Sequence, residues 1–123
     1  MARFDELSGA RYVSLVTYRR SGEAVPTPVW FVVRGGRGYV YTGEGAGKLK
    51  RIRLDPRVQV TPCSIRGKVK GPYRAGTARV LDGADAAQAR EAFAAKYGFQ
   101  WRFVIRRNER RGGRSVFIEV VPE

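Results

Sequence analysis

Histidine is absent from this chain of 123 residues. The imidazole ring is the side chain that most often acts as a general base near neutral pH, and it commonly ligates zinc and haem iron. Its absence excludes Ser-His-Asp and Cys-His triads, His-ligated haem and most zinc sites. If the chain is an enzyme, we therefore expect a bound cofactor to carry its chemistry.

Cysteine and long apolar runs are also scarce. The single cysteine, Cys63, cannot form an intrachain disulfide or hold a metal alone. No apolar run approaches the roughly 20 residues that a membrane-spanning helix needs. Residues 1–7 lack the apolar core of a signal peptide. We therefore expect a cytoplasmic protein that does not span a membrane.

Acidic residues are few. The chain has 11 Asp and Glu against 24 Lys and Arg, which gives a formal charge of +13. A charge of this size attracts polyanions over long distances. Nucleic acid, an anionic membrane face and a multiply charged cofactor all fit, and so does an arginine-rich codon bias without any partner. Composition does not choose among them.

The overall composition is that of one small globular domain. Hydrophobic residues make up 43% of the chain, and we expect residues 1–123 to share one core. Short strands joined by hairpin turns, with helices inserted, are typical of a small barrel, so the expected fold is mainly β. Six strands are predicted from β-branched and aromatic residues bounded by turn residues: Tyr12–Tyr18, Ala24–Val33, Tyr39–Thr42, Val58–Ser64, Tyr73–Leu81 and Ser115–Val121.

Helices are predicted at three places. One turn is expected over residues 4–10, and a short helix over residues 47–54, which Asp55-Pro56 ends. Another helix is expected to open at a capping box, Asp85 to Gln88, and to stop at Gly98. Apolar residues at helical spacing predict its buried face: Ala89, Phe93 and Tyr97.

The segment from residue 99 to residue 114 is predicted as an irregular connection. Its dense basic stretch, Arg106 to Arg111, is open to three interpretations: a solvated loop, a nucleic-acid contact or a grip on an anionic tail. Cys63 is expected to be a strand residue without chemistry, because no histidine or second cysteine supports it.

The most informative segment is a glycine-rich loop that leads into a basic helix. Thr42 is followed by Gly43-Glu44-Gly45-Ala46 and then by Gly47-Lys48-Leu49. Neither the Walker A motif nor the dinucleotide fingerprint fits this spacing. A helix N-terminus still suits a phosphate, because it offers unpaired N–H groups and a partial positive charge. Four cations crowd the same turns and favour this interpretation over a merely flexible turn: Lys48, Lys50, Arg51 and Arg53.

The segment Pro26-Thr27-Pro28-Val29-Trp30 is the second unusual feature. Two prolines at i and i+2 lie on one side of a strand and remove two ladder donors. The segment is therefore either an edge strand protected against aggregation or a strand that faces a flat ligand. In the second case we expect free backbone groups of Thr27 and Val29 to bind the ring edges. Trp30 is expected in the core, with a stacking surface as the alternative.

The chain resembles the flavin-binding split-barrel superfamily, which includes the pyridoxamine 5'-phosphate oxidases, at four places: Tyr41-Thr42, Lys48, Ile52 and Asp55-Pro56-Arg57-Val58. Within that superfamily, Pro26 to Phe31 and Gly47 to Ile52 look most like the actinobacterial branch of coenzyme F420-dependent enzymes. The similarity covers the chain from about residue 10 to about residue 100. It implies a six-stranded antiparallel split β-barrel that forms a homodimer, with each cofactor in a groove between the subunits.

The resemblance also implies roles for particular residues. Thr42 and Lys48 match the positions that hold the cofactor phosphate, and the strand from Pro26 to Phe31 matches the one beside the isoalloxazine-like ring. The FMN oxidases place Arg and Lys on that strand and an Arg before the helix lysine, where this chain has Pro26, Phe31 and Gly47. A pyridoxamine 5'-phosphate oxidase would also use a histidine, which this chain lacks.

Coenzyme F420 is a deazaflavin with a phosphodiester and an oligoglutamate tail, and its negative charges would suit the basic helix and the connection with Arg66, Lys68 and Lys70. The leading hypothesis is an F420-dependent oxidoreductase that passes a hydride from the reduced deazaflavin to a conjugated organic acceptor. The predicted cofactor-binding residues are Pro26, Thr27, Pro28, Val29, Trp30, Thr42, Gly47, Lys48, Lys50, Arg51 and Arg53. No metal ligand and no catalytic residue is assigned; water or Tyr73 is the candidate proton donor.

Three alternatives stay open. The same fold could use FMN as a reductase or oxidase. It could instead carry or sequester a cofactor without turning over any acceptor. A non-catalytic module could bind RNA or DNA, with Tyr39, Tyr41 and Trp101 stacking on bases, although no recognised nucleic-acid motif is present.

Overall fold

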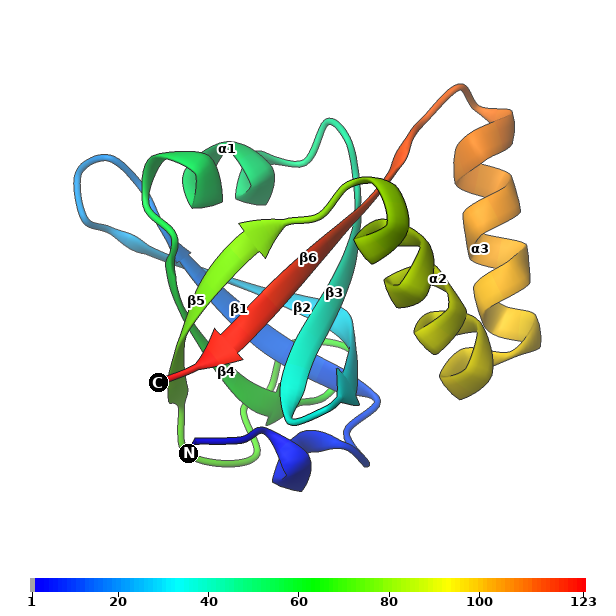
Figure 1. Ribbon diagram of the computed structural model, residues 1–123. Helices are drawn as coiled ribbons and strands as arrows, with labels where there is room; N and C mark the ends of the chain where they lie inside the picture. The colour runs from blue at the N-terminus through cyan, green and yellow to red at the C-terminus, as the bar shows by residue number, and fades with distance from the viewer. Residues whose placement is uncertain (1) are drawn as a thin grey trace.

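The computed structural model describes residues 2–123, which form a closed barrel of six antiparallel strands with helices at its end and side (Figure 1). The strands follow the order β1-β2-β3-β6-β5-β4, and β4 pairs with β1 to close the barrel. The predicted six-stranded antiparallel barrel is therefore confirmed. The elements are η1 (Asp5–Leu7), β1 (Tyr12–Tyr18), β2 (Ala24–Arg34), β3 (Arg37–Gly43), α1 (Gly47–Leu54), β4 (Arg57–Cys63), β5 (Arg74–Val80), α2 (Gly83–Tyr97), α3 (Phe99–Arg110) and β6 (Ser115–Pro122).

The predicted strands and the helix over residues 47–54 lie where expected, with small shifts at their ends. The predicted capping box was wrong. Helix α2 already begins at Gly83, its N-cap Asp82 makes no side-chain cap hydrogen bond, and Asp85 lies 3.8 Å from Arg79 instead. The predicted end of this helix is confirmed, because Gly98 adopts a φ of 57°, which favours glycine.

The irregular connection predicted over residues 99–114 was also wrong, because Phe99–Arg110 forms helix α3. Arginine is a good helix former, and Trp101 and Ile105 lie four residues apart on one buried face. This helix was not predicted because only two buried apolar residues stand among many arginines. Within residues 2–123, no helix is both long and apolar enough to cross a membrane.

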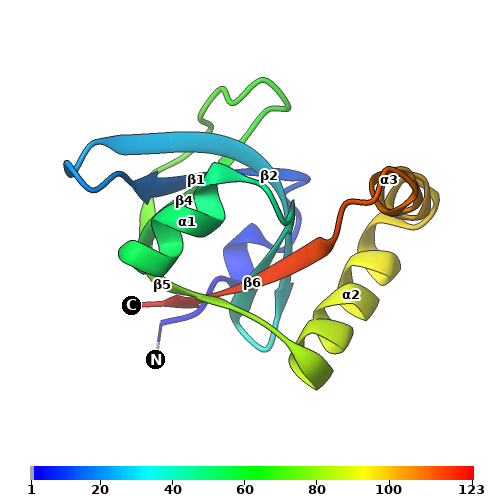
Figure 2. The same ribbon diagram turned by 90° about the horizontal axis from the view of Figure 1, so that it is seen from above.

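Two hydrophobic cores hold the molecule together. The first fills the barrel, where Phe4 and Leu7 of the N-terminal segment close one end and Leu49 and Ile52 of α1 close the other. Figure 2 shows α1 lying across the barrel as seen from above. The second core lies outside the barrel, between the helices and strands β2, β3 and β6. Its buried members are Val32, Leu81, Ala89, Ala92, Phe93, Tyr97, Trp101, Ile105 and Phe117.

Strand β2 changes partner along its length, which splits the barrel wall. Residues 24–30 pair with β1, whereas residues 31–34 pair with β3. Strand β3 then continues beside β6. The first part of β2 consequently has one edge without a neighbouring strand, and this is the part that contains both prolines.

Tyr97, the last residue of α2, bridges the point where β2 separates from β1. Its buried hydroxyl accepts the Phe31 N–H at 3.0 Å and lies 2.8 Å from the Arg11 carbonyl, to which it can donate. Its ring stacks on Trp30 with centroids 4.5 Å apart. The neighbouring ammonium of Lys96 donates to the carbonyls of Ala10 and Phe31. These contacts tie helix α2 to the divided wall and satisfy backbone groups that strand pairing leaves open.

Tyr97→Phe is expected to lower the free energy of unfolding by about 1–3 kcal/mol, because the buried Phe31 N–H loses its acceptor while the aromatic stacking remains. Urea unfolding would measure the loss. Tyr73→Phe is the matched control: Tyr73 is 41% exposed and its hydroxyl lies 3.5 Å from Ser14 Oγ, so we expect a change within about 0.5 kcal/mol. Equal losses in the two variants would contradict a bridging role for Tyr97.

Candidate functional site

The loop between β3 and α1 places a cation-rich helical end above the barrel. Leu49 and Ile52 bury one face of α1 in the barrel core. Because residues three apart share a helix face, this orientation brings Lys48 and Arg51 together on the neighbouring face. Burial of two apolar residues thus decides which way the two cations point.

Lys48 and Arg51 reach back to threonines of the barrel wall. Lys48 Nζ lies 3.5 Å from Thr42 Oγ1, at the end of β3. Arg51 Nε donates to Thr17 Oγ1 of β1 at 2.7 Å, and the Thr17 side chain is fully buried. We call Thr17, Thr42, Lys48 and Arg51 the Lys48–Arg51 cluster.

The charge of this cluster has no internal counterion. Among residues 2–123, the ion pairs leave Lys48 and Arg51 without a carboxylate. The nearby acids are engaged elsewhere, since Glu44 pairs with Arg114 and Asp55 with Arg57. Burial lowers the pKa of the Lys48 ammonium from its ordinary value, and the Arg51 charge lowers it further. A partly desolvated cation of this kind is suited to an anionic ligand.

Gly47 keeps the space in front of the cluster open. A Cβ atom at this position would stand 2.9 Å from Arg51 Nη1, so any side chain would displace the guanidinium. Ala46 offers no side-chain cap to the helix, and the first amides of α1, at Gly47 and Lys48, have no intrahelical acceptor. Backbone donors and two cations therefore converge at one helical end.

Lys50 and Arg53 do not join this cluster. Both side chains are exposed, and they lie three residues apart on the outward face of α1. The structure thus divides the four cations predicted at this helix into an inner pair, Lys48 and Arg51, and an outer pair. The contact between Arg51 and Thr17 was not predicted, since β1 carries no local signal for it.

The segment Pro26–Trp30 lies on the part of β2 that pairs only with β1. The Tyr97 hydroxyl joins Phe31 N–H to the Arg11 carbonyl, which indicates that odd-numbered residues of β2 turn their backbone groups toward β1. Strand alternation then turns the carbonyls of Pro26, Pro28 and Trp30 toward the free edge. This revises the expectation that Thr27 and Val29 offer the free backbone groups.

Side chains on this strand alternate in the same way. Pro26 and Pro28 are exposed on the outer face, Trp30 is partly buried against Tyr97, and Val29 is buried in the barrel. Thr27 is partly buried, and its hydroxyl lies 3.5 Å from the Leu15 carbonyl. The free edge therefore combines bare carbonyls with a flat apolar surface.

The basic connection with Arg66, Lys68 and Lys70 runs beside the same face. A Cβ atom at Gly67 would lie 4.0 Å from Pro28 Cδ, which places the connection next to the proline strand. All three cations are exposed. Tyr73 follows at the end of the connection, with its hydroxyl 3.5 Å from Ser14 Oγ.

The three aromatic residues considered for stacking on bases are engaged inside the protein. Trp101 is 3% exposed, and Tyr41 packs against it with ring centroids 4.8 Å apart. The Tyr39 hydroxyl donates to the buried carboxylate of Glu119, and burial together with this carboxylate raises the pKa of Tyr39. The prediction that Trp101 stacks on bases was wrong, because the ring is buried; Tyr39 and Tyr41 are partly buried by their contacts inside the protein.

The possible metal ligands and the one cysteine lie within residues 2–123. No group of three His, Cys, Asp or Glu side chains in residues 2–123 could hold a metal ion. Cys63 is buried in β4, and burial raises the pKa of its thiol, which disfavours the reactive thiolate.

Comparison with known proteins gives a family and a fold. A family model described as pyridoxamine 5'-phosphate oxidase matches residues 2–123. No match was found among curated proteins.

Solved structures share the fold at low sequence identity. The heme storage protein HutZ from Vibrio cholerae is 13% identical, with a TM-score of 0.71, and the match covers 94% of this chain and 83% of that one. A FAD-binding protein from Mesorhizobium loti is 16% identical, with a TM-score of 0.65 and coverages of 95% and 84%. An F420 reductase is 18% identical, with a TM-score of 0.57 and coverages of 98% and 93%. Together with the family match, these likenesses confirm the resemblance to the flavin-binding split barrels.

Lys48→Met is expected to raise the free energy of unfolding by about 1 kcal/mol near neutral pH, because it removes an uncompensated, partly buried charge. The lowered pKa of Lys48 means that this penalty is fully present below the folded-state pKa. It is relieved as the pH rises through that pKa toward the ordinary value of 10.5. The gain over the wild type should therefore shrink at alkaline pH.

Chemical denaturation across a pH series would measure this difference. Lys50→Met, on the exposed face of the same helix, is the matched control and should change stability by less than about 0.5 kcal/mol. If Lys48→Met were less stable than the wild type at neutral pH, the ammonium would stabilise the fold. That result would contradict the view that its charge is uncompensated.

Proposed function

Because the chain belongs to the pyridoxamine 5'-phosphate oxidase family, we propose that it is an oxidoreductase that uses coenzyme F420. The observation that carries the proposal is the Lys48–Arg51 cluster, in which two cations without a counterion meet the open end of helix α1. The cofactor phosphate would neutralise this charge and accept hydrogen bonds from both side chains.

The donors of the cluster fit a phosphodiester. Lys48 and Arg51 supply charged donors, the Thr42 hydroxyl lies beside Lys48, and the amides of Gly47 and Lys48 complete the set. Gly47 leaves room for a phosphate oxygen to approach the helix. Thr17 is a positioning residue, because it holds the Arg51 guanidinium toward the barrel at 2.7 Å.

The free edge of β2 fits the ring of the cofactor. The carbonyls of Pro26 and Pro28 can accept hydrogen bonds from ring N–H groups, and the proline side chains offer a flat apolar face. The prolines prevent β3 from pairing with this edge, since they donate no ladder hydrogen bond. When bound, a reduced deazaflavin supplies a hydride; the chain's residues hold the ring and exclude water from it.

Two observations favour F420 over FMN. Pro26, Phe31 and Gly47 replace the Arg and Lys that FMN oxidases of the superfamily use. The outward cations Lys50 and Arg53, and the basic connection beside Pro28, have no ion-pair partner within residues 2–123, so they can attract the carboxylates of an oligoglutamate tail. The likeness to an F420 reductase agrees with this choice, whereas haem would lack a histidine ligand here.

The acceptor would bind against the exposed face of the ring, beside Pro28 and the connection that ends at Tyr73. We assign the acceptor to the class of conjugated organic molecules, because a hydride adds to an activated double bond. Tyr73 is 41% exposed and its hydroxyl lies 3.5 Å from Ser14 Oγ; this hydroxyl is our candidate donor for the proton that follows, with water as the alternative. A second subunit would complete the groove, as the resemblance implies.

Lys48→Ala is expected to weaken F420 binding by about 10- to 100-fold, since it removes a charge-assisted hydrogen bond from a partly buried site. Lys50→Ala should have a smaller effect, because its side chain faces solvent. Fluorescence titration of the purified protein with F420 and with FMN, at low and moderate salt, would measure both.

Arg102→Ala is the control, because it removes the same charge from an exposed position on α3. Selective F420 binding that depends on Lys48 supports the proposal. Selective FMN binding would keep the site and change the cofactor, and it is the second candidate because of the likeness to a FAD-binding protein. Equal losses in Lys48→Ala and Arg102→Ala would remove the site assignment.

A further inference from the structure

Helix α3 presents large apolar side chains to solvent. Phe99 is 88% exposed, Phe103 68% and Val104 37%. Phe99 and Phe103 lie one helical turn apart, so their rings stand side by side on the outward face. Trp30 and Gln100 line a shallow groove together with these three residues, so the apolar surface extends from α3 to Trp30 of β2. Burial of Trp101 and Ile105 on the opposite face fixes this orientation.

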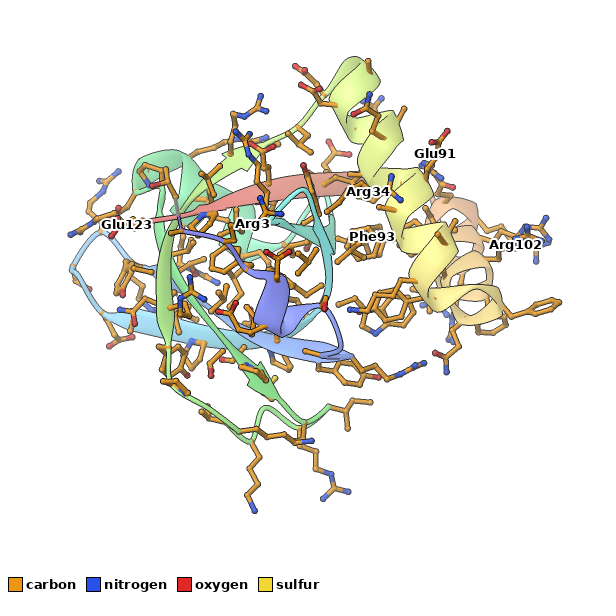
Figure 3. All side chains as sticks on the ribbon, turned by 60° about the horizontal axis from the view of Figure 1, so that its bottom comes forward. Arg3, Arg34, Glu91, Phe93, Arg102 and Glu123 are labelled. Atoms are coloured by element: carbon orange, nitrogen blue, oxygen red, sulfur yellow. The ribbon has the colours of Figure 1, made fainter. Side chains whose placement is uncertain are left out.

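Arginines surround the two phenylalanines. One surface groove is lined by Phe99 and Phe103 together with Arg102, Arg106, Arg107, Arg110 and Arg111. None of these arginines takes part in an ion pair among the described residues, whereas the one acid of the helix, Glu109, pairs with Arg90 of α2. Figures 1 and 2 show α3 as the outermost element on its side, and in Figure 3 Arg102 extends away from the molecule.

A second copy of this chain has few free acids to supply the missing charge. Of its 11 acidic residues, eight already pair with arginines: Asp5, Glu6, Glu23, Glu44, Asp55, Asp85, Glu109 and Glu119. The other three lie apart, in the turn before α2, on α2 and at the C-terminal residue. A second copy therefore has few free carboxylates to offer, which favours a different kind of anionic molecule as the partner of α3.

We propose that the outward face of α3 docks on an anionic lipid bilayer. The two phenyl rings would enter the interface between headgroups and acyl chains, and the surrounding arginines would contact lipid phosphates. Phe99 and Phe103 project from the helix with 88% and 68% of their surface exposed. Rings exposed in this way can insert into a soft surface that offers no preformed pocket. Single-stranded nucleic acid also binds cations and aromatic rings, and it is therefore an outcome of the test below. This docking does not require the cofactor proposed above, but the two surfaces meet at Trp30, which lines the groove beside α3.

Vesicle sedimentation with the full chain tests the proposal. The protein should bind vesicles of phosphatidylcholine mixed with phosphatidylglycerol and should bind pure phosphatidylcholine far less. Arg106→Gln combined with Arg110→Gln should weaken binding by about 10- to 30-fold, at about tenfold or less per charge near an anionic surface. Phe99→Ala combined with Phe103→Ala should weaken it about tenfold or more.

The connection between β4 and β5 provides matched controls, because it contains the same kinds of side chain. Arg66→Gln combined with Lys68→Gln removes the same net charge, and Ile65→Ala truncates a side chain that is 65% exposed. Both controls should keep nearly wild-type vesicle binding. Circular dichroism and thermal unfolding would confirm that the α3 variants remain folded, as expected for exposed substitutions.

Three outcomes would overturn the proposal. The control variants could lose vesicle binding as much as the α3 variants, which would show that only net charge matters. The α3 variants could lose affinity for a single-stranded oligonucleotide while the wild type ignores vesicles, which would assign the face to nucleic acid. The phenylalanine variant could convert a dimer into a monomer, which would assign the face to a second copy.

Discussion

The change of partner along β2 is the constraint on which the rest of the structure depends. Pro26 and Pro28 donate no ladder hydrogen bond, and they lie in the part of β2 that pairs with β1 and not with β3. The missing β3 partner leaves an edge of carbonyls at Pro26 and Pro28. Beyond Trp30 the strand also parts from β1, and there Tyr97 satisfies the backbone N–H of Phe31. The contacts of Tyr97 hold helix α2 against strand β2 of the barrel. Helix α3 follows α2 directly in the chain and lies on its outer side. The exchange of partners along β2 thus gives both the proposed ring site and the contact that holds α2.

The proposed phosphate site arises from side-chain packing, whereas the free edge of β2 arises from missing strand pairing. Leu49 and Ile52 fix α1 across the barrel end, which leaves Lys48 and Arg51 close to each other and partly desolvated. Without an anion, the partly buried charge of Lys48 lowers the free energy of unfolding. The lowered pKa of Lys48 has the same cause, because burial and Arg51 disfavour its charged form. Natural proteins commonly retain a destabilising arrangement where binding requires it. An anion bound at the proposed site would therefore also stabilise the fold, because it would compensate the charge of Lys48.

Much of the fold could be predicted from the sequence, because alternating strands and turn residues act locally. The helix over residues 47–54 was predicted for the same reason, since Asp55-Pro56 ends it. Helix α3 was missed because its buried stripe is only Trp101 and Ile105 among many arginines. The division of the cations on α1, the contact of Arg51 with Thr17 and the burial of Trp101 depend on tertiary packing. Local patterns contain no information about such contacts.

A crystal structure of the protein grown with F420 would test the central claim most directly. The account predicts the cofactor phosphate within hydrogen-bond distance of Lys48 Nζ and the Thr42 hydroxyl, with the ring against the free edge at Pro26 and Pro28. A cofactor bound with its phosphate on α3 or on the connection between β4 and β5, and with Lys48 still unliganded, would contradict it.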